Sequence, residues 1–169
     1  MNVLNIHERR LEANFDQVGA LIDTLASPGD RLWPKRLWPP MKFDRPLGVG
    51  ADGGHGPIRY YVEEYTPGNS IKFRFTGPKG FDGYHRLDVL EGLGNTVVIR
   101  HTLEMKTHGL AIILWPLVFR HLHDALVEDA FTVAEQTLGL PLNVQPWSLW
   151  VKILRWFLTG GKAQPQRFS

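Results

Sequence analysis

Apolar and polar residues alternate along much of the first two thirds of the chain, and this spacing predicts β-strands with one buried face. The clearest example is Ile71–Phe75, in which apolar residues alternate with Lys72 and Arg74. Turns rich in Gly and Pro separate the alternating segments. The expected strands are Val3–Glu12, Met41–Phe43, Ile58–Tyr65, Ile71–Phe75, Tyr84–Glu91 and Asn95–Thr107.

Two longer segments have helical spacing instead. Asn14–Ala26 begins with Asn14 and has Gln17 three residues later, which indicates a capping box. The longest helix is expected over Ile112–Leu138, with Pro116 either in its first turn or at a kink.

A third, short helix is expected at Trp147–Leu158, after the helix-ending sequence Gly139-Leu140-Pro141. We therefore expect a main domain over residues 1–140 and a C-terminal extension over residues 141–169. The end of the extension, Gly160–Ser169, is expected to be a loose tail.

The last hairpin, built around Gly92-Leu93-Gly94, has two registers to choose between. A three-residue loop keeps the apolar residues of both strands on one face, whereas a four-residue loop moves one set to the other face. We predict the first register. It places Val89 opposite Val97, Leu87 opposite Ile99 and His85 opposite His101.

Composition narrows the class of protein. Hydrophobic residues make up 43% of the chain and charged residues 21%, which is typical of a globular fold. The net charge is only +2 and the basic residues are scattered, so we expect no nucleic-acid partner. The absence of cysteine excludes disulfides and thiolate metal sites. The N-terminus lacks the order of a signal peptide and no apolar run is long enough to span a bilayer, so we expect a cytoplasmic protein.

Three segments carry a resemblance to a known superfamily. They are GPIRYYVEEYTPGNSIKFRFTG at Gly56–Gly77, HTLE at His101–Glu104 and WPLVFRHLHDAL at Trp115–Leu126. With the order of elements, they resemble the helix-grip fold of the SRPBCC superfamily, which includes START-related lipid-transfer domains and polyketide cyclases. The resemblance implies an α+β fold, in which a curved antiparallel sheet wraps around a long C-terminal helix and leaves a cavity between them. The short extra C-terminal helix lies beyond the usual end of that fold.

The superfamily contains enzymes, carriers and binding proteins, so the resemblance does not assign an activity. We interpret the chain as a binding protein for a hydrophobic small molecule or lipid, without a cofactor. The alternative is a cyclase, dehydratase or isomerase for an aromatic or polyketide-like substrate, with His85 or His101 as acid/base catalyst. The residues predicted to contact the ligand are Tyr60, Val62, Phe73, Phe75, His85, Leu87, Ile99, His101, Leu103, Val118 and Leu122.

Two other patterns in the sequence are typical of binding sites, but we interpret neither of them as one. His121, Asp124 and Glu128 share one face of the long helix and could bind a divalent metal, but we interpret them as a solvated face and expect no metal site. His123 lies off that face. Gly48–Gly56 lacks the Lys-Ser/Thr ending and the following helix of a phosphate-binding loop, so we expect a flexible connection that could gate the cavity.

The helix Trp147–Leu158 is unusually apolar for a segment outside the main domain, and Lys152 and Arg155 are its only charged residues. Such a helix packs against its own domain or a second copy of the chain, or it lies at a membrane surface. The third functional alternative is therefore a protein peripheral to a membrane that exchanges its ligand with lipid. The residues predicted for membrane or homodimer contact are Trp147, Trp150, Leu154 and Phe157.

Overall fold

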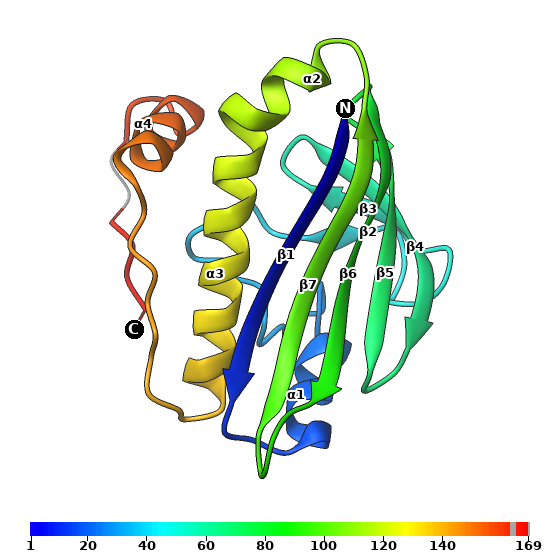
Figure 1. Cartoon of the computed structure of the whole chain (residues 1–169), viewed down its shortest axis with the longest axis vertical. Coiled ribbons are helices and arrows are strands. Elements are labelled where there is room, and N and C mark those ends of the chain that lie inside the picture. The colour runs from blue at the N-terminus through cyan, green and yellow to red at the C-terminus, as the bar shows by residue number, and fades with distance from the viewer. Residues whose placement is uncertain (163–164, 169) are drawn as a thin grey trace.

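The computed structural model describes residues 1–162 and 165–168. Its seven strands form one antiparallel sheet in the order β1-β7-β6-β5-β4-β3-β2, so the first strand pairs with the last (Figure 1). The strands are β1 (Asn2–Leu11), β2 (Lys42–Phe43), β3 (Asp52–His55), β4 (Ile58–Thr66), β5 (Ser70–Gly77), β6 (Phe81–Glu91) and β7 (Val97–Thr107).

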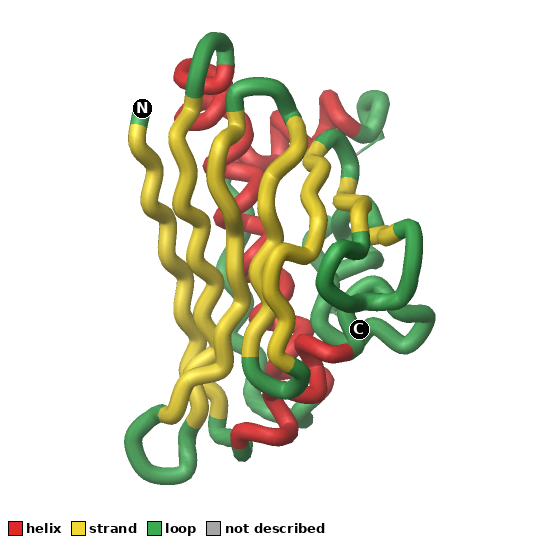
Figure 2. The backbone as a smooth tube through the Cα atoms, turned by 90° about the vertical axis from the view of Figure 1, so that its right-hand side faces the viewer, coloured by secondary structure: helices red, strands yellow, loops and turns green. Residues whose placement is uncertain are grey.

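One long helical run covers one face of the curved sheet, and Figure 2 shows it behind the strands. The run consists of α2 (Ala111–Leu114), η1 (Trp115–Phe119) and α3 (Arg120–Thr137). At one end of the molecule α1 (Phe15–Asp23) lies under the same face, and α4 (Leu149–Leu158) packs on the outer side of α3 (Figure 1). The predicted α+β helix-grip architecture is confirmed, including the extra C-terminal helix.

The start of α1 follows directly from its sequence. The Asn14 side chain accepts a hydrogen bond from the backbone N–H of Gln17 at 2.9 Å, and the Gln17 side chain accepts one from the backbone N–H of Asn14 at 3.1 Å. Both donors would otherwise lack a partner at the helix end. The capping box expected from these two residues is therefore confirmed.

Pro116 lies inside the long helical run and not at its start. The surrounding segment, η1, is a π-helical turn in which the N–H of Arg120 donates to the carbonyl of Trp115. Proline has no N–H, and its ring clashes with the carbonyl of the preceding turn of an α-helix. A wider turn accommodates it within a helix that begins four residues earlier than η1, at Ala111.

The register of the β6–β7 hairpin differs from the prediction by two residues. Leu87, and not His85, lies opposite His101. The connection is longer than three residues and is closed by a hydrogen bond from the N–H of Gly92 to the carbonyl of Thr96 at 3.0 Å. A shift of two residues keeps every side chain on its predicted face. His85 and His101 therefore share the inner face, but as diagonal neighbours.

The glycine-rich segment contains a strand that the sequence did not predict. This strand, β3, pairs with β2 on one side and β4 on the other. A Cβ atom at Gly53 would overlap the carbonyl oxygen of Lys42, and Gly54 has a φ of 141°, which favours glycine. The glycines thus permit close backbone approach, and the expectation of a flexible connection is wrong for Asp52–His55.

The C-terminal extension is anchored to the main domain by Asp129 of α3. The Trp147 indole N–H donates to Asp129 Oδ2 at 2.9 Å, and the Gln166 amide donates to Asp129 Oδ1 at 2.6 Å. Arg155 of α4 packs over two indole rings, with its guanidinium carbon 4.2 Å from the centroid of Trp38 and 4.3 Å from that of Trp147. The described part of the expected loose tail is therefore held through Gln166, while residues 163, 164 and 169 lie outside the described residues.

Candidate functional site

A cavity of about 280 Å³ lies between the sheet and the long helix. Its wall is almost entirely carbon, contributed by the strands, the helix and the connection between α1 and β2. Much of the wall is aromatic: Trp33, Trp38, Phe73, Phe75, Phe81, Trp115, Phe119 and Phe131.

Most of the residues predicted to contact a ligand lie in this wall. They are Phe73, Phe75, His85, Leu87, His101, Leu103, Val118 and Leu122. Tyr60, Val62 and Ile99 do not line the cavity: each is 0% exposed and belongs to the packed core. Only the residues of the cavity wall can therefore contact a ligand, and for these eight residues ligand contact stays a prediction.

His85 and His101 lie side by side in the sheet wall, with His101 Nε2 3.3 Å from His85 Nδ1. The rings of Phe73 and Phe75 stack on His85 at centroid distances of 4.8 Å and 5.2 Å. Burial lowers the pKa of both histidines well below the usual value, so both are neutral at pH 7. Their other nitrogens, His85 Nε2 and His101 Nδ1, are buried and have no hydrogen-bond partner among the described residues. The pair therefore presents mainly carbon to the cavity.

Two more histidines line the cavity, and the sequence reasoning missed both. His55 comes from β3 and His123 from α3. A signal for His123 was present, because it lies four residues from Phe119 and four from Val127, which share the inward face of the helix. No comparable signal marked His55, because a segment so rich in glycine was not recognised as a strand.

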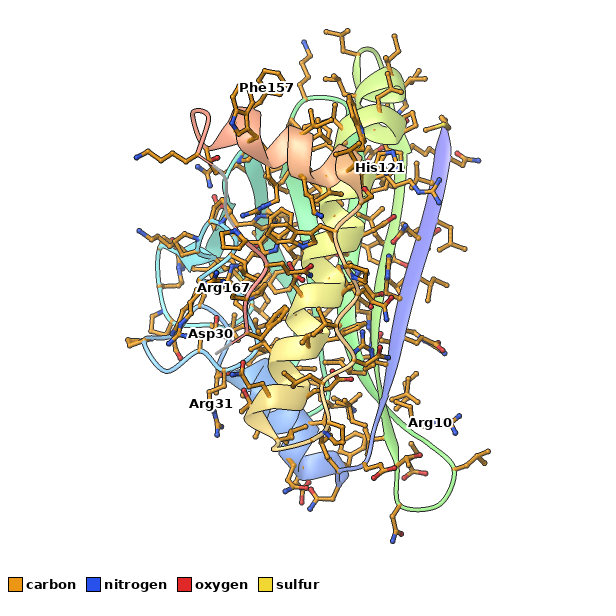
Figure 3. All side chains as sticks on the ribbon, turned by 90° about the vertical axis from the view of Figure 1, so that its left-hand side faces the viewer. Arg10, Asp30, Arg31, His121, Phe157 and Arg167 are labelled. Atoms are coloured by element: carbon orange, nitrogen blue, oxygen red, sulfur yellow. The ribbon has the colours of Figure 1, made fainter. Side chains whose placement is uncertain are left out.

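Asp124 and Glu128 face the edge strand β1, which covers most of each side chain and leaves the remainder exposed. His7 of β1 lies between them, with Nε2 3.1 Å from Asp124 Oδ1 and Nδ1 2.7 Å from Glu128 Oε1. Arg9 donates to Glu128 Oε2 at 2.7 Å. The interpretation of a solvated face is wrong for these two carboxylates, because β1 covers them from a distant part of the chain. Figure 3 shows the third residue, His121, on the side of the helix that carries α4.

The charges of this cluster support one another. Burial alone would lower the pKa of His7, but the hydrogen bonds with Asp124 and Glu128 outweigh burial and raise it to about 9. For Asp124, burial would raise the pKa, but hydrogen bonds from His123 and His7 hold it below the usual range. Burial keeps the pKa of His123 lowered despite its bond to Asp124. At neutral pH His7 is therefore an imidazolium between two carboxylates.

The cavity meets solvent near the end of α4. Four residues of its wall are exposed: Pro39, Gly56, Pro57 and Leu158. Leu158, the last residue of α4, is 69% exposed. The mouth is therefore formed by the end of α4, the α1–β2 connection and the β3–β4 turn.

The residues predicted for membrane or homodimer contact are not all accessible. Trp150 is 44% exposed and Phe157 is 69% exposed, whereas Leu154 is half-buried. Trp147 precedes α4 and is only 5% exposed, because its ring packs against Arg155 and Trp38. It is thus an anchor of the extension and is excluded from any such contact surface.

No family model and no curated protein matches this chain. Solved structures do match it. A point mutant of norcoclaurine synthase from Thalictrum flavum, in complex with a transition-state analogue, is 17% identical, with a TM-score of 0.62 over 82% of this chain and 96% of that one. The fold is the helix-grip fold. A solution structure from Thermobifida fusca is 12% identical, with a TM-score of 0.61 over 84% of this chain and 97% of that one.

A third helix-grip neighbour, Ara h 8.0201, is 13% identical and has a TM-score of 0.60 over 82% of this chain and 99% of that one. This chain therefore matches each of these neighbours over nearly the whole length of the neighbour. At such low identity the similarity establishes the fold and assigns no activity.

Proposed function

We propose that this helix-grip protein binds a small, largely apolar molecule in the cavity between the sheet and the long helix. The observation that carries the proposal is a carbon-walled cavity of about 280 Å³. A dry cavity of about 150 Å³ is large enough to bind benzene. The cavity therefore suits a molecule on the order of two rings, and its aromatic walls favour a flat one.

A structural neighbour supports an aromatic ligand. Norcoclaurine synthase from Thalictrum flavum has been solved in complex with dopamine and hydroxybenzaldehyde, and that structure is 15% identical to this chain with a TM-score of 0.57. Both compounds contain a single aromatic ring. The comparison supports ligand binding by a protein of this fold, while the ligand of this chain follows from its own cavity.

The histidines favour binding over the alternative of a cyclase, dehydratase or isomerase. A general acid or base must reach the proton that it moves. The unpaired nitrogens of His85, His101 and His123 are buried, and none has a hydrogen-bond partner in the described parts of the chain. The three histidines would therefore contact a ligand through their ring carbons, and proton transfer to or from the ligand would require the imidazole rings to rotate.

The test uses 2-naphthol, a two-ring aromatic compound, with the purified protein. We expect one molecule to bind per chain in calorimetry, and Leu122→Trp to weaken binding at least tenfold because the larger ring fills part of the cavity. Leu110→Trp is the matched control, because Leu110 is 74% exposed and outside the wall. Equal binding by the wild type and Leu122→Trp would contradict the proposal. Native mass spectrometry of the freshly purified protein would identify any co-purified compound.

We also propose a second function, docking on an anionic membrane surface, on the basis of the exposed apolar residues near the cavity mouth. Within the described residues, no helix is long and apolar enough to cross a bilayer. However, α2, η1 and α4 carry exposed side chains at the same end of the molecule (Figures 1 and 3). We call these residues the apolar end: Ile113, Leu114, Leu117, Leu149, Trp150 and Phe157.

Two observations favour a lipid surface as the partner of the apolar end. The Trp150 indole N–H donates to the carbonyl of Leu117 at 2.7 Å, which joins α4 to η1. Two exposed cations lie close by in the chain: Lys152 is on α4, and Arg120 begins α3 directly after η1. Apolar side chains with nearby cations are typical of helices that lie in the interface of anionic bilayers.

Vesicle sedimentation tests this second function. We expect the protein to sediment with vesicles that contain phosphatidylglycerol, and the double variant Trp150→Ser, Phe157→Ser to lose most of that binding. Leu93→Ser is the control, because Leu93 is 79% exposed in the β6–β7 connection, at the opposite end of the molecule. Sedimentation that is unchanged in the double variant would exclude docking through the apolar end. A dimer in size-exclusion chromatography that the same variant dissociates would instead indicate a second copy of the chain.

A further inference from the structure

The side chains of β1 and α3 bring three potential metal ligands together. His7 Nε2 lies 3.1 Å from Asp124 Oδ1, and His123 Nδ1 lies 3.3 Å from the same oxygen. Each of the three residues offers one ring nitrogen or carboxylate oxygen, and these three atoms lie within 4.8 Å of one another. We propose that His7, His123 and Asp124 form a binding site for a divalent transition-metal ion, of which Zn²⁺ is the probe. The proposal does not depend on what the cavity binds.

The two distances from a histidine nitrogen to Asp124 Oδ1 suit a tetrahedral ion. Zinc binds imidazole nitrogen and carboxylate oxygen at about 2.0–2.1 Å, so neighbouring ligand atoms of a tetrahedral site lie about 3.3 Å apart. Both distances from Asp124 Oδ1 agree with that value. Hydrogen bonds have similar lengths, so these distances alone do not distinguish a metal site from a hydrogen-bonded cluster. The residues around the three ligands supply the further evidence.

Glu128 orients His7 in the way that a second carboxylate usually orients a metal-binding histidine. The other ring nitrogen of His7, Nδ1, lies 2.7 Å from Glu128 Oε1, and Arg9 donates to Glu128 Oε2 at 2.7 Å. A metal-bound histidine almost always donates its second N–H to a carboxylate, a carbonyl or water, which fixes the ring and aims the free nitrogen at the ion. This arrangement aims His7 Nε2 at Asp124, and a bound ion would displace to solvent the proton that His7 Nε2 donates to Asp124 Oδ1.

Asn5 supplies a further oxygen at the same place. Its side-chain nitrogen lies 3.0 Å from Asp124 Oδ1, and its side-chain oxygen is buried without a hydrogen-bond partner among the described residues. The two ends of an amide are assigned from their hydrogen bonds, so either one can face the cluster. With the oxygen turned inward, Asn5 offers a neutral fourth ligand and its own unsatisfied atom gains a partner.

The donor set also limits which ion fits. Two imidazoles and one carboxylate suit zinc, iron and other transition metals, whereas calcium and magnesium prefer oxygen ligands only. Asp124 is 31% exposed, so an ion can reach the site from solvent at the edge of the sheet where β1 lies beside α3 (Figure 1). His123 is also part of the cavity wall, so a bound ion would fix one side chain of that wall.

The test uses full-length, tag-free protein that has been treated with a chelator and then titrated with ZnCl₂ in a calorimeter. We expect one Zn²⁺ per chain. Asp124→Asn and His123→Ala should each weaken binding more than 100-fold, and Glu128→Gln should weaken it by about 10–100-fold, because it only orients His7. His108→Ala is the matched control, because His108 is exposed in the connection between β7 and α2. Circular dichroism checks that each variant is folded.

Three results would overturn the metal site. They are no stoichiometric binding by the wild type, wild-type affinity in Asp124→Asn, and an equal loss in His108→Ala, which would indicate ions on exposed histidines. Where a variant does not fold, Co²⁺ added to the wild type decides. Intense visible absorption typical of a four- or five-coordinate ion supports the site, and the weak spectrum of the hydrated ion contradicts it.

Discussion

His55 is a titratable side chain enclosed by aromatic rings, with Trp33 at a centroid distance of 4.8 Å and Tyr60 at 5.8 Å. Burial lowers its pKa from 6.5 to about 3. Between these two values the unfolded chain binds a proton that the folded protein does not. The stability associated with neutral His55 is therefore complete above pH 6.5 and is lost as the pH falls through this window.

We predict that His55→Phe flattens this acid dependence. One pKa unit corresponds to about 1.4 kcal/mol, so at pH 5 the proton uptake by the unfolded chain costs the wild type about 2 kcal/mol more than the variant. Urea unfolding at pH 7 and pH 5 measures the difference, with the exposed His108→Phe as control. The same loss of stability in the wild type and in His55→Phe would show that His55 is not buried as a neutral group.

The sequence could predict the face on which a side chain lies, because faces alternate with every residue along a strand and recur every three or four residues along a helix. His85 and His101 were placed on the inner face, although their pairing was wrong, because an error of two residues preserves the face. His7 could not be placed next to Asp124, because the two residues are 117 positions apart in the chain and nothing local joins them. The charged cluster is thus a product of tertiary structure.

Gly53 shows how one glycine determines an element. Its backbone approaches Lys42 of β2 so closely that Gly53→Ala would place a methyl group against a backbone carbonyl. We predict that this variant loses about 1–3 kcal/mol of unfolding free energy, as overpacked sites do. Gly48→Ala is the control, because the nearest atom to a Cβ there is 3.9 Å away. Equal stability of the two variants in urea unfolding would mean that β2 and β3 separate at little cost.

Arg155 determines whether α4 stays on the domain. Its guanidinium packs over the rings of both Trp38 and Trp147 and donates to the carbonyl of Leu37. A desolvated cation–π pair contributes about 2 kcal/mol. We predict that Arg155→Met increases amide hydrogen exchange of Leu149–Leu158 at least tenfold. Exchange in the connection between β6 and β7, residues 92–96, should not change, because it lies at the opposite end of the molecule (Figure 1).

The matched control for α4 is Lys152→Met, since Lys152 lies on the same helix but is exposed. Protection of α4 that is equal in the two variants would show that other contacts hold the helix. The existence of α4 was predictable from its apolar spacing, but its orientation was not. The buried side is formed by Val151 and Arg155, four residues apart, and a charged residue gave no sign that it would point inward.

At the scale of the whole molecule, the order of strands and helices and the resemblance to the helix-grip fold together predicted the architecture. The physical reason is that an antiparallel sheet with one apolar face must be covered, and one long helix follows it. The sequence could not predict the size of the cavity, which depends on how closely side chains from the sheet, the helix and the α1–β2 connection approach. It also gave no indication that the extension would reach back to the mouth through Leu158.

This position of Leu158 leads to a prediction about exchange of the cavity ligand. Leu158 is 69% exposed and also part of the cavity wall, so it covers the mouth while it contributes little to the core. Leu158→Ser should therefore increase the dissociation rate of 2-naphthol several-fold in stopped-flow fluorescence and leave the unfolding free energy within about 0.5 kcal/mol of the wild type. Leu93→Ser makes the same change at the other end of the molecule and should alter neither quantity. A dissociation rate that Leu158→Ser leaves unchanged would mean that the ligand leaves by another route.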